Sequence, residues 1–330
     1  MAFIFSILLN PIMRNLYIRL GMYDIPGEIK THRGMIPHSG GVAVFISFVI
    51  SLLIIRFMTH FPSGTLRELR YITLGAGVVF LMGLIDDIKK PGGIRAEVKF
   101  VMEVIIASFM VLRGFKINFI SPDYIAYILS VLWIVGITNA INIIDIMDGL
   151  SSSQIIIASF AFYFITLPQE ELYVNLLAGI LGFSVLGFMP FNMSKRLKIF
   201  LGDSGSLFCG FILAVISLGA RYSETNPLAV YSPLFILSVA IFDTLYVSYM
   251  RIKRGMSPFK GSKDHFAIRL EMMGYSRIKI VILTSVFLII MSFFSFFLTK
   301  VGLGAGIFML VFVTIFLFYV AKYLSSVRII

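Results

Sequence analysis

Carboxylate and carboxamide side chains stand at the ends of several apolar segments, in the motifs GLIDD, TNAINIIDIMDGL and FLGDSGS. The residues concerned are Asp86, Asp87, Asn139, Asn142, Asp145, Asp148 and Asp203. Adjacent carboxylates repel each other unless a cation lies beside them, and oxygen ligands of this kind suit Mg²⁺, with Mn²⁺ as a substitute. A magnesium ion held by one or two protein oxygens and by substrate phosphates is a common arrangement for phosphoryl transfer.

Other polar residues add to this pattern. Asp243 lies inside an apolar segment, where a carboxylate indicates a functional site by default. Lys99 and neighbouring basic residues would hold phosphate charge. Two loops contribute His32 and, further along the chain, His265 and Arg269.

Each motif also has a purely structural interpretation. Asp86 and Asp87 would cap a helix end, and Asn139 and Asn142, three residues apart, would hydrogen-bond to a neighbouring helix. GDSGS reads equally as a loop with an N-cap, and Asp243 as half of an ion pair. The functional interpretation is favoured because, without it, a separate structural explanation would have to be correct for each of these motifs.

The composition identifies the elements that must position these residues. Of the 330 residues, 58% are hydrophobic and 14% are charged, and the mean hydropathy is +0.95. A soluble protein of this size has too little interior for so much apolar surface. The single cysteine, Cys209, excludes an intrachain disulfide framework. We therefore expect an all-α, polytopic membrane protein forming one domain over residues 1–330.

Eleven apolar segments are long enough, or nearly so, to cross a bilayer. The first lacks a basic n-region and is expected to be a retained helix rather than a signal peptide. The predicted spans are Met1–Leu20, Gly40–Ile55, Tyr71–Ile85, Ala96–Leu112, Tyr124–Ala140, Ser151–Leu167, Tyr173–Phe188, Ser204–Leu218, Leu228–Met250, Ile278–Leu298 and Gly302–Leu324.

The basic residues predict the orientation of these spans. With the N-terminus outside, 21 of the 28 Lys and Arg residues fall in inside segments, which is the bias expected of cytoplasmic loops. The C-terminus then faces the cytoplasm, together with most of the acidic residues. The net charge of +11 is thus explained by topology and by the acidic cluster, and it does not indicate nucleic-acid binding.

The same motifs resemble those of the polyprenyl-phosphate N-acetylhexosamine-1-phosphate transferases, and the likeness extends over nearly the whole chain. The first loop, DIPGEIKTHRGMIPHSGG, is similar to a block of the N-acetylglucosamine branch. GLIDD resembles the paired aspartates of the family, and TNAINIIDIMDGL its Asn-x-x-Asn-x-x-Asp-Gly-x-Asp-Gly block. FLGDSGS, the Asp243 segment and GSKDHFAIRLEMMGYS resemble the three remaining blocks. Six blocks in the order of the family are highly specific.

The resemblance implies a reaction and roles for residues. The enzyme would transfer a sugar 1-phosphate from a UDP-N-acetylhexosamine to undecaprenyl phosphate in the plasma membrane, releasing UMP. Asn142 and Asp203 would hold Mg²⁺, and Asp87 with Asp86 would position or deprotonate the lipid phosphate. The substrate-binding residues would be Lys99, Asp145, Asp148, Phe200, His32, His265 and Arg269, with Phe200 stacking on uracil. Homodimerisation is compatible with this interpretation.

Departures from the family pattern bear on the sugar. His265-Phe-Ala-Ile replaces a His-x-His-His motif, and Ile29, Ser39 and Ile146 replace other usual residues. The His-His-His block of the peptidoglycan lipid I synthase is missing, so UDP-MurNAc-pentapeptide is disfavoured and UDP-GlcNAc is expected. An ion-coupled transporter, a CDP-alcohol phosphotransferase and a non-catalytic scaffold are the alternatives. A transporter typically shows repeats and midplane helix breaks, whereas these acids gather at helix ends.

Overall fold

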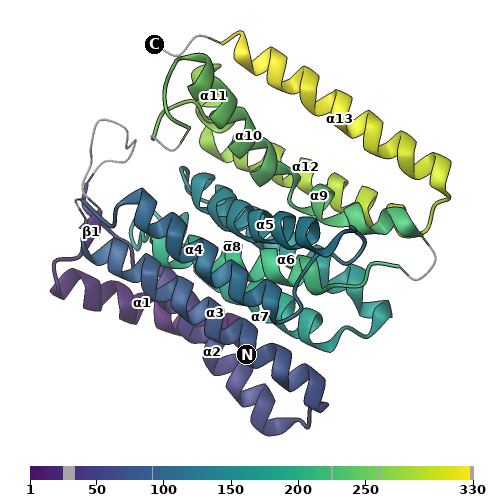
Figure 1. The fold of residues 1–330 in the computed structure, drawn as a ribbon. Helices are drawn as coiled ribbons and strands as arrows, with labels where there is room; N and C mark the ends of the chain where they lie inside the picture. Colours follow the sequence, from purple (N-terminus) through teal and green to yellow (C-terminus); the bar gives the residue numbers. More distant parts are fainter. Residues whose placement is uncertain (25–33, 91, 224–225, 259–260, 328–330) are drawn as a thin grey trace. The chain divides into compact units, whose positions relative to one another are not determined.

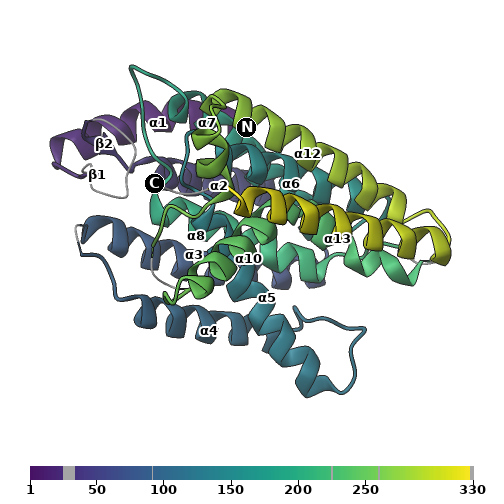
Figure 2. The same ribbon diagram turned by 90° about the horizontal axis from the view of Figure 1, so that it is seen from above.

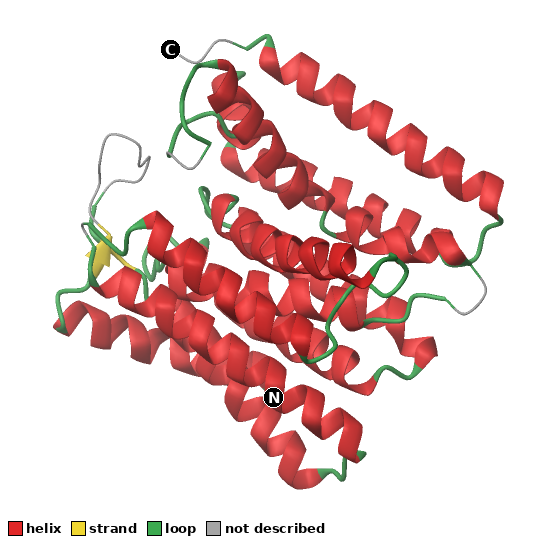
Figure 3. Ribbon diagram, in the orientation of Figure 1, coloured by secondary structure: helices red, strands yellow, loops and turns green. Residues whose placement is uncertain are grey.

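The computed structural model describes residues 1–24, 34–90, 92–223, 226–258 and 261–327. The chain is 76% helical, which confirms the predicted all-α class (Figure 3). A short antiparallel pair, β1 (Tyr23–Asp24) and β2 (Ile36–Pro37), joins the ends of the first loop. The chain divides into two compact units, residues 1–220 and 221–330, and each is described separately. The prediction of a single domain over residues 1–330 stays a prediction.

The N-terminal unit is a bundle of eight helices in the described residues (Figure 1). Their bounds are α1 (Ala2–Arg19), α2 (Gly40–Met58), α3 (Ser63–Ile88), α4 (Ala96–Leu112), α5 (Asp123–Ile143), α6 (Leu150–Thr166), α7 (Leu172–Asn192) and α8 (Gly202–Gly219), with a 3₁₀ turn, η1 (Leu167–Gln169), after α6. Helix α8 is the centre of this unit. It lies among the other helices of this unit (Figure 2) and packs against α2, α3, α5, α6 and α7. Of its 18 residues, 78% are buried.

Small residues allow α3 and α8 to approach closely. A Cβ at Gly75 would lie 2.7 Å from the Phe211 ring, and one at Gly83 would lie 2.5 Å from the Asp203 carbonyl oxygen. Helix α2 uses the same device, since a Cβ at Gly41 would lie 2.3 Å from the Gly205 nitrogen. Side chains larger than hydrogen would separate these helices, so the glycines fix where α8 begins relative to α2 and α3.

The C-terminal unit contains η2 (Pro227–Tyr231), α9 (Ser232–Ile236), α10 (Ser238–Lys253), α11 (Phe266–Met272), α12 (Arg277–Leu298) and α13 (Leu303–Ser325). The segment predicted as one span, Leu228–Met250, is bent by 68° between its two helical parts. Pro233, in the first turn of α9, has no N–H to donate, and Leu237 separates α9 from α10. A hydropathy pattern does not register such a bend.

A helix covers each of the eleven predicted spans, but not all of these helices are long and apolar enough to cross a membrane. In the described residues eight helices are, or up to nine if the bent pair is one span. Helix α4 has 17 residues, and α1 combines 18 residues with Arg14 and Arg19. The structure thus establishes a chain with several membrane-length helices, while the count of eleven and the orientation are not confirmed.

Candidate functional site

The last turn of α3 meets the first turn of α8, and this places Asp86 and Asp87 beside Asp203. Gly202 has φ +74°, a backbone conformation that favours glycine, and a Cβ there would lie 2.6 Å from an Asp87 carboxylate oxygen. Together with Gly83 on the facing helix, it allows the carboxylates to converge. Three of the aspartates predicted from separate motifs therefore lie in one cluster.

Asp87 binds the N-terminus of α8 directly. Its Oδ1 accepts a hydrogen bond from the Asp203 backbone N–H at 3.0 Å, and its Oδ2 accepts one from the Ser204 N–H at 2.9 Å. The first N–H groups of a helix have no partner within the helix, and a carboxylate there is also stabilised by the helix dipole. Asp87 thus caps a helix from another part of the chain.

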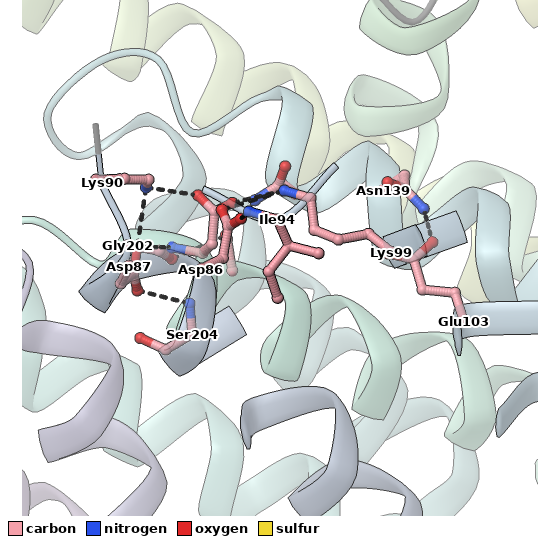
Figure 4. A network of polar contacts seen from close by, with 12 residues as sticks. Asp86, Asp87, Lys90, Ile94, Lys99, Glu103, Asn139, Gly202 and Ser204 are labelled. Carbon is pink, nitrogen blue, oxygen red and sulfur yellow. Dashed lines mark hydrogen bonds and ion pairs between the residues drawn. The ribbon is translucent and has the colours of Figure 1, made fainter. Parts of the chain in front are cut away.

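Two lysines bridge the three carboxylates (Figure 4). The Lys90 ammonium lies 2.9 Å from Asp87 and 3.0 Å from Asp203. The Lys99 ammonium lies 3.2 Å from Asp86 and 3.1 Å from the second oxygen of Asp203. Asp86 also accepts a hydrogen bond of 2.5 Å from the Ile94 N–H. The sequence motifs single out Lys99, whereas Lys90 is expected only as one of the neighbouring basic residues that would hold phosphate charge.

The side chains in this cluster differ in exposure. The Asp87 side chain is 0% exposed and that of Asp86 5%, whereas Asp203 is 20%, Lys99 23% and Lys90 26% exposed. Asp86 and Asp87 are therefore enclosed by the protein. Asp203 and the two ammonium groups are the parts of the cluster that a dissolved molecule can reach.

Asn142 and Asp145 lie close to this cluster. The Asn142 amide nitrogen donates to the Ser206 hydroxyl at 2.8 Å, and Ser206 is one helical turn beyond Asp203 on α8. Asp145, in the loop after α5, accepts a hydrogen bond from the Ser151 hydroxyl. The Asn142 side chain uses its nitrogen to hold its orientation, so its carbonyl oxygen is not committed by this bond.

The charges in the cluster shift two pKa values outside the helices. Burial lowers the pKa of the Lys90 ammonium, but the carboxylates of Asp203 and Asp87 raise it by a larger amount. The net shift of this pKa is therefore upward. Burial raises the pKa of the Asp145 carboxyl to about 7; the Ser151 hydrogen bond opposes this shift and the Asp203 charge adds to it. Lys90 is thus a permanent cation, whereas Asp145 changes charge near neutral pH.

A second group of predicted residues lies together on the loop before α8 and the loop after α5. Asp148 forms an ion pair with Lys198 at 2.5 Å, and the Lys198 ammonium lies 5.6 Å from the centre of the Phe200 ring. Lys198 was not predicted, although its position two residues before Phe200 places it on the same short segment. The group offers a carboxylate, a cation and an aromatic face.

Asn139 forms an interhelical hydrogen bond, as its structural interpretation predicts. Its amide donates to the Glu103 carboxylate on α4, and to the Val135 carbonyl at 3.0 Å. Glu103 is buried and lies one turn beyond Lys99 on the same helix (Figure 4). This pair attaches α4 to α5 and thereby supports the helix that carries Lys99.

The C-terminal unit contains the remaining predicted residues. Asp243 accepts a hydrogen bond from the Phe266 N–H at 3.1 Å and lies 2.7 Å from the His265 ring nitrogen Nδ1. Asp264 pairs with Arg254 and with the fully buried Arg269, each at 3.1 Å. These contacts hold α11 in place, and substrate-binding roles for His265 and Arg269 stay predictions. His32 lies outside the described residues.

The fold and the site define a helical membrane protein with a cluster of carboxylates and ammonium groups where two buried helices meet. A family model, Glycosyl transferase family 4, matches residues 69–221, which include all of this cluster.

Curated proteins support the same assignment. The chain is 34% identical over 290 residues to the Bacillus subtilis (strain 168) protein named "Probable undecaprenyl-phosphate N-acetylglucosaminyl 1-phosphate transferase", covering 83% of this chain and 78% of that protein. Proteins of Yersinia pestis and Escherichia coli (strain K12), both named undecaprenyl-phosphate alpha-N-acetylglucosaminyl 1-phosphate transferase, are 23% and 24% identical, each over 80% of this chain and over 73% and 72% of their own lengths. The chain belongs to glycosyl transferase family 4.

Proposed function

We propose that this protein transfers N-acetylglucosamine 1-phosphate from UDP-N-acetylglucosamine to undecaprenyl phosphate and releases UMP, starting the assembly of a cell-envelope polysaccharide. The relatives' names supply the acceptor and the transferred group, and the family implies the UDP donor. The observation that carries the proposal is the cluster of Asp203, Lys90 and Lys99 at the entrance to a buried helix terminus. It presents cations for phosphate oxygens and a carboxylate for a divalent ion.

The donor atoms fit Mg²⁺ bound partly by substrate. Among the described residues no group of three or more His, Cys, Asp or Glu side chains could hold a metal ion by itself. The partly exposed Asp203 carboxylate and the Asn142 amide oxygen supply the one or two protein oxygens that are typical when phosphates and water complete the shell. Bound there, Mg²⁺ would neutralise charge on the pyrophosphate. We propose that these two residues hold it.

We propose direct displacement at the β-phosphorus of the UDP-sugar. An oxygen of the lipid phosphate forms a bond to this phosphorus, and the bond to the oxygen bridging the α- and β-phosphorus breaks, so that UMP leaves with the electron pair. A phosphate dianion is already a nucleophile, so positioning and charge neutralisation contribute most of the lowering of the activation barrier. Asp87 is enclosed and binds two backbone N–H groups, which argues against a covalent aspartyl-phosphate at this residue.

The lysines have the complementary task. In the structure each ammonium bridges two carboxylates, so both are held within a few ångströms of Asp203. When the pyrophosphate is present, phosphate oxygens would replace one carboxylate at each ammonium. Because the carboxylates already hold both ammonium groups in place before the substrate binds, less reorganisation is needed in the transition state.

The Asp148, Lys198 and Phe200 group is proposed to hold the uridine. Phe200 provides a face on which a base stacks, and Asp148 accepts hydrogen bonds from the uracil ring or ribose. The Lys198 ion pair keeps the Asp148 carboxylate in place. His32 and Asp145 are proposed to contact the sugar and the phosphates, whereas substrate-binding roles for His265 and for the buried Arg269 stay predictions.

We propose that the chain crosses the plasma membrane eleven times, with the N-terminus outside and this site facing the cytoplasm, where UDP-sugars are made. The charge bias of the loops supports the orientation. The short helices α1 and α4 would then be accommodated by local thinning of the bilayer. Homodimerisation is compatible with this arrangement.

The experiment incubates purified protein with undecaprenyl phosphate, Mg²⁺ and one UDP-sugar at a time, and measures UMP. We expect UMP and a lipid-linked product with UDP-GlcNAc. Product only with UDP-MurNAc-pentapeptide would indicate a lipid I synthase, and no UMP with any UDP-N-acetylhexosamine would contradict the proposal. Isotope exchange between UMP and UDP-GlcNAc without the lipid would contradict direct displacement, because only a covalent intermediate permits that exchange.

A further inference from the structure

A cavity of about 690 Å³ lies between α10 and α13 of the C-terminal unit. Its walls are two stripes of side chains that recur every three or four residues, as expected for one face of a helix. On α10 the stripe comprises Ser238, Ile241, Phe242, Leu245, Tyr246, Tyr249 and Lys253. On α13 it comprises Leu310, Val313, Thr314, Leu317, Phe318, Ala321, Lys322 and Ser325. Both stripes are predominantly apolar, and each has a lysine near its C-terminal end.

Two ion pairs and a hydrogen bond connect these two C-terminal ends. Arg254, next to Lys253, pairs with Asp264 at 3.1 Å, and Asp264 pairs with Arg269 at the same distance. Arg269 in turn donates to the Leu324 carbonyl at the end of α13, also at 3.1 Å. The ammonium groups of Lys253 and Lys322 therefore lie at the same end of the groove. Both side chains are exposed, and neither has an ion-pair partner within the described part of the chain.

The side chain of Tyr246 also lines this groove, and it carries a buried hydroxyl. Tyr246 is 4% exposed, and its hydroxyl has no hydrogen-bond partner among the described residues. A buried polar group normally has one. Tyr246 lies seven residues before Lys253, so it is roughly 10 Å further along the helix. A ligand that pairs with both lysines and accepts a hydrogen bond from the Tyr246 hydroxyl has an anionic group at one end. Its hydrogen-bond acceptor lies about two helical turns deeper in the groove.

The length and exposure of the groove match a membrane lipid. The α10 stripe runs for roughly 22 Å, which exceeds half of the hydrocarbon thickness of about 30 Å, so it can cover an acyl chain of one leaflet. Helix α13 is only 11% buried within the structure, which leaves the groove accessible from the bilayer. Lysines at the end of such a helix reach the headgroup layer.

We propose that this groove binds a diacyl phospholipid with an anionic headgroup. Lys253 and Lys322 bind the phosphate, the Tyr246 hydroxyl donates to a glycerol-ester carbonyl, and the apolar stripes cover the acyl chains. The lipid fills the space between α10 and α13 and thereby stabilises the C-terminal unit. This role is separate from the transferase reaction and does not depend on it.

The test is native mass spectrometry of the full-length protein in detergent, titrated in turn with phosphatidylglycerol, phosphatidylcholine and undecaprenyl phosphate. The variant Lys253→Gln/Lys322→Gln removes both cations. The variant Lys279→Gln/Lys300→Gln is the matched control, because it removes the same charge from exposed lysines of the same unit outside the groove. A third variant, Tyr246→Phe, removes only the hydroxyl.

We expect phosphatidylglycerol to bind the wild type more tightly than phosphatidylcholine does. The lysine variant should bind it about 30-fold more weakly, since two lysines act on one headgroup. The control variant should match the wild type, and Tyr246→Phe should weaken binding a few-fold. Equal binding of the neutral lipid, equal binding by the lysine and control variants, or binding of undecaprenyl phosphate alone would each overturn the proposal. So would a protein that binds none of the three lipids.

Discussion

The double hydrogen bond from α8 to Asp87 makes a quantitative prediction about Asp87→Asn. The asparagine side chain has an NH2 group in place of one carboxylate oxygen, so in this geometry one of the two backbone N–H groups, that of Asp203 or that of Ser204, faces a donor and loses its acceptor. Losing one charge-assisted hydrogen bond costs about 1.5–3 kcal/mol. Removing the negative charge from the helix N-terminus costs about 0.3–1 kcal/mol more. We expect the variant to be destabilised by about 2–4 kcal/mol.

The only tryptophan is suited to this measurement. Trp133 on α5 donates to the Ser217 hydroxyl on α8 at 2.8 Å, so its fluorescence reports on the packing of the helix that Asp87 caps. In detergent, the apparent melting temperature of Asp87→Asn should be lower by roughly 3–6 °C. Asp148→Asn is the matched control, because this substitution also removes one carboxylate charge. The Asp148 carboxylate, however, pairs with the Lys198 side chain instead of backbone N–H groups.

The control should melt within about 2 °C of the wild type, since a partly exposed ion pair contributes about 0–1 kcal/mol. The melting temperature of Asp203→Asn should also be nearer to that of the control than to that of Asp87→Asn, because in the described part of the chain the Asp203 carboxylate accepts hydrogen bonds from two lysine side chains and none from backbone N–H groups. An Asp87→Asn protein that melts with the wild type would refute the capping role.

Three further predictions concern the same site. Lys90→Gln should lower kcat/KM for UMP release at least 100-fold, because it removes a cation fixed beside the pyrophosphate; a loss below 10-fold would contradict this role. Because the pKa of Asp145 is about 7, the site gains a negative charge as pH rises from 6 to 8. The KM for UDP-GlcNAc should therefore rise about 3- to 10-fold over that range, and Asp145→Asn should abolish the rise in a series of initial-rate measurements. Gly83→Ala should reduce both melting temperature and activity, because its Cβ would lie 2.5 Å from the Asp203 carbonyl oxygen; normal behaviour in both assays would show that α3 and α8 can separate without cost.

Much of the fold followed from hydropathy, because each apolar segment forms a helix. The bend of 68° between α9 and α10 did not, since it lies at the backbone of Leu237 and leaves no signal in the hydropathy of the segment. Similarly, the apolar runs of α1 and α4 predicted membrane spans, although neither helix is among those that are both long and apolar enough to cross a membrane. Local sequence thus predicts helices better than it predicts their relation to a bilayer.

The site was predicted in part. The convergence of Asp86, Asp87 and Asp203 was expected from their motifs. That Asp87 caps a distant helix could not be, because the partner N–H groups are 116 and 117 residues away in the chain. Lys90 was not singled out as a site residue, because a pair of lysines after an apolar segment is also expected as a signal of membrane topology. Its position three residues after Asp87 was the available indication.

The central claim is that Asp203 and the two lysines catalyse the transfer of a sugar phosphate to a lipid phosphate. The most direct test measures UMP and lipid-linked N-acetylglucosamine phosphate together, from UDP-GlcNAc, undecaprenyl phosphate and Mg²⁺, with the wild type and with Asp203→Asn. The wild type should form both products in equal amounts, and the variant should form neither while its Trp133 fluorescence shows an intact fold. Full activity of Asp203→Asn, or UMP released by the wild type without lipid-linked product, would contradict the claim.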